Sequence, residues 1–157
     1  MIRAVPSPTD FARGDLTQVL LAKIRSELLC GDAVAPDEGG WDGPPTKNGS
    51  TYHSYVVLTP MPAADQSGPL ADSSADWTLP YRIDSYGVSR AQVEWQADRS
   101  RALIRPVHRE NMTAGGEVYR IQQVRVQSLG GIGRSDATDP PEYSQSDIVA
   151  VYVSKEL

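Results

Sequence analysis

The stretch Trp77-Thr78-Leu79-Pro80-Tyr81-Arg82-Ile83-Asp84 decides the fold, because a large apolar residue occupies every second position. Such alternation predicts a β-strand with one buried face. The pattern stops at Ser85-Tyr86-Gly87, and no helix breaker follows Arg90 until Pro106. Ser89 is placed to cap this helix, since its hydroxyl can accept a backbone N–H of the first turn. The segment therefore predicts a strand, a tight connection and a helix.

The predicted helix carries two apolar stripes instead of one. At about 100° per residue, Trp95 marks one arc, and Val93, Ala97 and Ile104 lie on roughly the opposite arc. We expect the stripe with Trp95 to pack on the chain's own sheet. The second stripe is either tolerated in solvent, as scattered apolar residues often are, or packs on a neighbouring subunit.

The remaining elements follow from shorter patterns. Leucine periodicity predicts a helix over 16–29, capped by Asp15 and ended by Gly31. Strands are predicted at 55–58, at 117–129 with a β-bulge at Gln122-Gln123, and at 147–153. The last strand is apolar on both faces, which predicts a central position or cover on both sides.

The predicted fold class is α+β, with a mostly antiparallel sheet of about four strands and two helices packed on one face. The 157 residues are expected to form a single domain. Residues 1–14 read as an extended N-terminal arm, and 31–54, 62–76 and 129–145 read as long loops. Because too few elements remain to cover the second face of the sheet, another subunit is expected to cover it.

The composition of the chain disfavours several classes of function. A formal net charge of −5 disfavours a nucleic-acid binder that works through bulk positive charge. The single cysteine, Cys30, cannot form an internal disulfide. Residues 1–11 lack the apolar run of a secretory signal, and no segment approaches a membrane span. We expect a soluble protein that is made in the cytosol and contacts no membrane.

No catalytic motif survives inspection of the sequence. The segment from Gly130 to Gly133 is glycine-rich, but Arg134-Ser135 follows where a phosphate-binding loop would have Lys-Ser or Lys-Thr. His53 and His108 stand at unrelated positions, and Cys30 has no activating neighbours. We therefore expect no enzyme, with no catalytic, cofactor or metal site.

Subunit contacts are the functional sites that the pattern favours. Trp41 stands alone in a polar loop and either packs back onto the domain or anchors a partner. The arginines around the second helix form either a solvated face or pairs with acidic loops of another subunit. The interface candidates are Arg90, Val93, Ala97, Arg101, Ile104 and Trp41.

Residues 86–103, which read YGVSRAQVEWQADRSRAL, resemble the strand-to-helix segment of tail terminator proteins of long, non-contractile-tailed phages. The similarity is greatest to proteins of phages that infect actinobacteria. The flanking order is similar too, with an N-terminal helix, a Tyr-Val-Val-Leu strand and a final Val-Ala-Val-Tyr-Val strand. In layout the resemblance covers most of residues 15–153. It leaves the 31–54 and 129–145 loops unexplained.

The resemblance implies a homo-oligomeric ring, expected to be a hexamer, in the tail neck of a virion that is assembled in the host cytoplasm. Such a ring caps the head-proximal end of the tail tube and stops the polymerisation of the tail tube protein. It also joins the tail to the head-completion (stopper) protein, while genomic DNA passes through the lumen without sequence-specific binding. A negative chain suits such passage, because duplex DNA should not adhere.

Other functions remain open. A head-tail stopper or a tail tube subunit tends to be rich in β-barrel structure, so two helices on one sheet face would favour the terminator. A small-molecule binding domain or enzyme would need a concave site with convergent polar groups. If the second helix stripe is an interface, Ala97→Glu should break the ring and leave the monomer folded. Trp95→Ala should then destabilise the core.

Overall fold

Two helices and nine strands make up the described part of the chain, which in this computed structural model comprises residues 13–44, 49–62, 76–106, 110–137 and 140–155. The helices are α1 (Arg13–Arg25) and α2 (Arg90–Ile104). The strands are β1 (Cys30–Asp32), β2 (Gly40–Trp41), β3 (Tyr52–His53), β4 (Tyr55–Pro60), β5 (Asp76–Gly87), β6 (Glu110–Ala114), β7 (Glu117–Ser128), β8 (Gly133–Ser135) and β9 (Glu142–Lys155).

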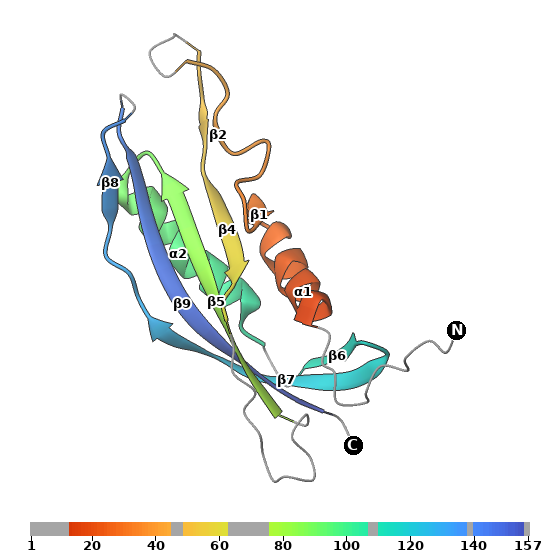
Figure 1. Ribbon diagram of the computed structural model, residues 1–157. Helices are drawn as coiled ribbons and strands as arrows, with labels where there is room; N and C mark the ends of the chain where they lie inside the picture. Colours follow the sequence, from red (N-terminus) through yellow and green to blue (C-terminus); the bar gives the residue numbers. More distant parts are fainter. Residues whose placement is uncertain (1–12, 45–48, 63–75, 107–109, 138–139, 156–157) are drawn as a thin grey trace.

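Seven of these strands form one curled, mixed sheet (Figure 1). The order is β1-β4-β5-β9-β7-β6, with β8 also paired to β9. All neighbours are antiparallel except β1 and β4, which are parallel. The prediction of about four antiparallel strands is therefore wrong. The four predicted strands are present as β4, β5, β7 and β9. Strands β1 and β8 have only three residues each, which is too short to show alternation, and the five residues of β6 include only two apolar side chains, Met112 and Ala114.

Local predictions within these elements are confirmed in three places. Ser89 caps α2, and its hydroxyl accepts a hydrogen bond from the Gln92 backbone N–H at 3.2 Å. Strand β9 is central, lying between β5 and β7. The pairing of β7 with β9 shifts register between Ile121 and Gln123, which is the predicted β-bulge.

The first helix begins and ends earlier than predicted. Asp15 lies inside α1 and does not cap it, and its carboxylate accepts a hydrogen bond from the Gly115 backbone N–H at 2.9 Å. Gly31 does not end the helix in a left-handed conformation as predicted, because it lies in β1 and pairs with Val57 of β4. The left-handed Ala33, with a φ of 62°, follows that strand. The 31–54 segment contains β1, β2 and β3, and the 129–145 segment contains β8. Nearly all of the predicted arm at 1–14 and loop at 62–76 lies outside the described residues.

Both helices lie on one face of the sheet, and α1 also connects its two ends (Figure 1). Helix α2 packs on β5 and β9, whereas α1 contacts β1, β6 and α2. The Arg25 Nε donates to the Cys30 carbonyl of β1 at 3.0 Å, and Lys23 pairs with Glu110 of β6 at 2.5 Å. Because β1 and β6 are the outermost strands, the curl of the sheet is what brings both to one helix.

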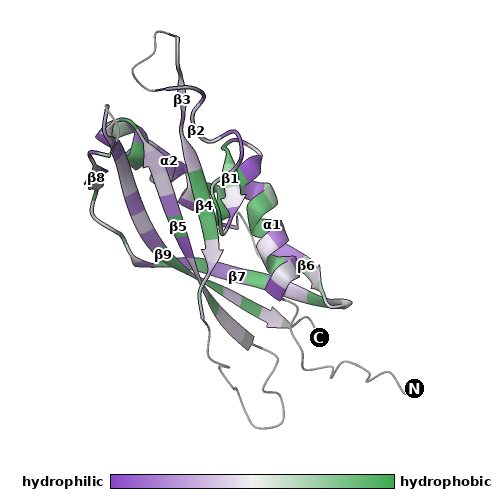
Figure 2. Cartoon of the chain, turned by 45° about the horizontal axis from the view of Figure 1, so that its top comes forward, coloured by the Kyte–Doolittle hydropathy of each residue, from purple (hydrophilic) through white to green (hydrophobic). Residues whose placement is uncertain are grey.

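The core fills the space between the helices and this face of the sheet. Apolar residues alternate with polar ones along the long strands, as the hydropathy colouring shows (Figure 2). Helix α1 contributes a continuous stripe of leucines and Ile24. The fully buried large side chains include Leu16, Leu20, Leu21, Ile24, Leu58, Tyr81, Ile83, Ile104, Tyr119 and Ile121.

Helix α2 packs with the opposite stripe from the one expected. Val93, Ala97 and Ile104 have no solvent-exposed surface, whereas Trp95 is 58% exposed. The prediction that Trp95 packs on the chain's own sheet, with the other stripe facing outward, is wrong. The small side chains of Ala97 and Ser100 allow the helix to approach the sheet closely, and a tryptophan at this contact would hold it away.

Replacing Trp95 with alanine is therefore expected to change the free energy of unfolding by no more than about 0.5 kcal/mol, as for other surface positions. Urea denaturation followed by circular dichroism measures this change. A loss of roughly 3 kcal/mol or more would mean that the indole ring of Trp95 is buried in the core.

Candidate functional site

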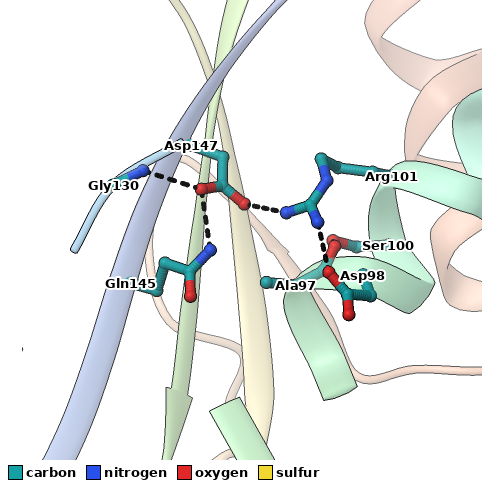
Figure 3. A network of polar contacts seen from close by, with 7 residues as sticks. All are labelled: Ala97, Asp98, Ser100, Arg101, Gly130, Gln145 and Asp147. Carbon is teal, nitrogen blue, oxygen red and sulfur yellow. Dashed lines mark hydrogen bonds and ion pairs between the residues drawn. The ribbon is translucent and has the colours of Figure 1, made fainter. Parts of the chain in front are cut away.

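A buried carboxylate, Asp147 of β9, is the centre of the best-connected polar network on the helix-covered face (Figure 3). Its side chain has no solvent exposure. One oxygen accepts hydrogen bonds from Gln145 Nε2 at 2.9 Å and from the Gly130 backbone N–H at 3.0 Å. The other oxygen forms an ion pair with Arg101 of α2. A buried charge needs such partners, and this carboxylate has three of them.

This network fixes three parts of the fold to one another. It joins α2 through Arg101, β9 through Asp147 and Gln145, and the turn after β7 through Gly130 (Figure 3). A Cβ atom on Gly130 would lie 2.0 Å from the Ser146 carbonyl oxygen, so only glycine fits at this close approach. The arrangement holds the β7–β8 connection against β9 and offers no reactive group to solvent.

The residues predicted for a subunit interface do not form one surface. Val93, Ala97 and Ile104 are completely buried within the chain, so their assignment to an exposed contact is wrong. Arg101 has a side chain only 15% exposed and points to Asp147. Arg90 lies on the outer side of α2 and pairs with Glu94 at 3.0 Å. Any role of Arg90 or Arg101 in a subunit contact stays a prediction.

Trp41, the sixth candidate, lies on the small β2–β3 hairpin that extends from one end of the sheet (Figure 1). Its ring contacts Tyr52 edge-on, with centroids 5.5 Å apart. The Tyr52 hydroxyl donates to Glu142 of β9 at 2.8 Å. Burial, together with this hydrogen bond, raises the pKa of Tyr52 above its ordinary value. The hairpin is thus tied to the sheet, and whether Trp41 also contacts a partner stays a prediction.

The described residues hold no group of three or more His, Cys, Asp or Glu side chains that could bind a metal ion. His53 Nε2 lies 3.5 Å from Asp42, while His108 lies outside the described residues. Neither described helix is long and apolar enough to cross a membrane.

Cys30 is buried at the start of β1, and its burial raises the pKa of the thiol to about 11, although nearby Arg25 opposes the shift. Because the thiolate is the reactive form, Cys30 in the native protein should react with iodoacetamide at pH 8 far more slowly than in the urea-unfolded protein. Mass spectrometry of quenched samples measures both rates. Equal rates would contradict the burial of Cys30.

No known family model matches the sequence, and no curated protein matches it. Solved structures do match the fold. A chain in the virion of a native gene transfer agent particle is 14% identical, with a TM-score of 0.57, and the match covers 91% of this chain and 97% of that chain. A second solved chain, whose name gives no function, is 18% identical with a TM-score of 0.51. That match covers 92% of this chain and 93% of the other chain.

These likenesses concern the whole fold, because nearly the full length of each chain is covered. At such low identity they establish a shared arrangement of the curled sheet and its helices and nothing about individual residues.

Sequence reasoning missed two features that the structure reveals. One is Asp147, which reads in the sequence only as the first residue of a predicted strand. The other is the exposed part of β7 around Arg125 and Val126, where Val126 looks like an ordinary inward-facing strand residue. The only available signal was the parity change at Gln122-Gln123, which indicated that β7 bends away from its neighbours.

Proposed function

We propose that this chain is a structural protein of a phage-like virion. The observation that carries this proposal is the likeness of its fold to a chain in a gene transfer agent virion, over 91% of this chain and 97% of that one. A match that uses almost all of both chains favours a common architectural task more than a shared small motif would. Because a fold alone can serve many functions, the proposal needs a direct test.

Within this role, the tail terminator is the function we favour. Its ring, expected to be a hexamer, would cap the head-proximal end of the tail tube, stop polymerisation and join the head-completion protein, with DNA passing through the lumen. Support comes from the resemblance of residues 86–103 and from the two helices on one sheet face, α1 and α2. The curled sheet is compatible with the stopper and the tube subunit as well, so it does not discriminate. The proposal assigns the chain no reaction and no cofactor.

Immunogold labelling of purified particles tests the proposal. An antibody against this chain should label one position, at the junction of tail and head, and mass spectrometry should detect the chain in particles that have been purified through a density gradient. Labelling along the whole tail would instead identify a tube subunit. If the particles lack the chain, the proposed virion role is wrong.

A further inference from the structure

Among the described residues, the second half of β7 has a free edge. Strand β6 pairs with residues 117–121 of β7 and reaches no further than Ile121. On that side no described strand lies beside residues 122–128, whose backbone pairs only with β9. An unpaired strand edge is a template on which another chain can dock.

The side chains on this free edge are uncharged polar or apolar apart from one arginine, Arg125. Residues 118–135 contain three arginines and no acidic residue. Arg134 pairs with Asp136 at 2.8 Å, which leaves the exposed Arg125 as the main charge of the free edge. Beside it, Val126 is 39% exposed and Leu129 is 60% exposed. We call residues 122–129 the β7 edge.

The opposite end of the sheet has the complementary character. Residues 31–44 carry four acidic residues, Asp32, Asp37, Glu38 and Asp42, and no basic one. The first three are exposed and line an open cavity of about 420 Å³ beside β1. Arg25 also borders this cavity, so the carboxylates outnumber the cation three to one. Val34, also on the cavity wall, is 69% exposed, and we call residues 32–38 the acidic end.

The exposed apolar residues lie mainly at these two places. Of the five large hydrophobic side chains that are exposed in the described residues, Val34 belongs to the acidic end, and Val126 and Leu129 belong to the β7 edge. Val118 lies in the part of β7 that pairs with β6, and Trp95 lies on α2. The free part of β7 with β8 and the acidic end with β1 lie on opposite sides of the molecule (Figure 1).

We propose that copies of this chain associate head to tail, with the β7 edge of one copy seated on the acidic end of the next. Contacts between two different patches of the same chain form rings when the rotation between copies closes. Opposite local charges would steer two chains together although each has a net charge of −5. The inference rests on the proposed function, because a ring-forming virion protein requires such a contact, and it replaces the α2 stripe as the predicted interface.

Sedimentation velocity of the full chain over a range of concentrations and salt tests the contact. The wild type should form assemblies larger than a monomer, and Arg125→Glu should weaken association about tenfold or more because like charges then face each other. The variant with Asp37→Lys and Glu38→Lys should be equally defective. Combining all three substitutions in one chain should restore association. Arg90→Glu reverses one charge on α2 and should have no effect.

The results of these experiments test the proposed contact independently of the proposed virion role. A wild type that stays monomeric at every concentration, or an assembly that Arg90→Glu disrupts and Arg125→Glu does not, would overturn the proposed contact. So would a failure of the combined variant to recover while its melting temperature matches the wild type. None of these results would remove the chain from purified particles, whereas its absence from particles would leave the solution contact measurable.

Discussion

Replacing Asp147 with alanine is expected to lower the free energy of unfolding by roughly 3 kcal/mol, because the largely buried Arg101 would keep only the exposed Asp98 as an ion-pair partner. Arg101, only 15% exposed, would lose its inward ion-pair partner. The Gln145 amide and the Gly130 N–H would lose their acceptor at the same time. Urea denaturation followed by circular dichroism measures the loss.

Asp98→Ala is the matched control, since Asp98 is the other carboxylate that pairs with Arg101 and is 73% exposed. Exposed ion pairs contribute little, so this variant should lose no more than about 1 kcal/mol. The double variant Arg101→Ala with Asp147→Ala should lose less than the sum of its single changes, because the two residues interact directly. Similar small losses for Asp98→Ala and Asp147→Ala would show that the buried pair does not hold α2 to β9.

The sequence was informative where structure is determined within a short segment. The capping of α2 by Ser89 and the alternation in β5 depend on residues that are near neighbours in the chain, and both were predicted correctly. The bulge in β7 was also visible, because a change of parity within one strand needs no knowledge of its partner.

The extent and curl of the sheet could not be predicted, because they depend on pairing between distant segments. Strand β1 has only three residues and is a strand because it pairs in parallel with β4. The paired residues Cys30 and Val56 are 26 positions apart in the sequence. The predicted orientation of α2 was wrong for a related reason. Periodicity identified two stripes, but only the close approach of the helix to the sheet decides that the stripe with Ala97 is buried and that Trp95 is not.

The candidate sites were harder still to foresee. Asp147 and Arg101 are 46 residues apart and meet only because α2 crosses β9. Among the described residues, the β7 edge is free because β6 pairs with β7 no further than Ile121. The four acidic residues of 31–44 are visible in the sequence, but their position at the sheet end opposite Arg125 is a consequence of strand order.

Ala97→Glu distinguishes the observed packing of α2 from the one that the sequence suggested. Ala97 has no exposed surface, so a glutamate there must bury a carboxylate against the core or push the helix off the sheet. We expect a loss of roughly 4 kcal/mol or more in the free energy of unfolding, a large share of the stability of an ordinary domain. Thermal unfolding and urea denaturation of the purified variant measure it.

Ala91→Glu provides the matched control for this change, because Ala91 lies on the same helix, is exposed, and receives the same new side chain. Near the helix N-terminus a negative charge is tolerated or mildly stabilising, so the control should keep its full stability. A folded Ala97→Glu protein as stable as Ala91→Glu would mean that the Ala97 stripe faces outward, and it would return the subunit contact to α2. If Ala97→Glu alone loses stability, the Ala97 stripe is buried against the sheet and cannot be a contact between subunits.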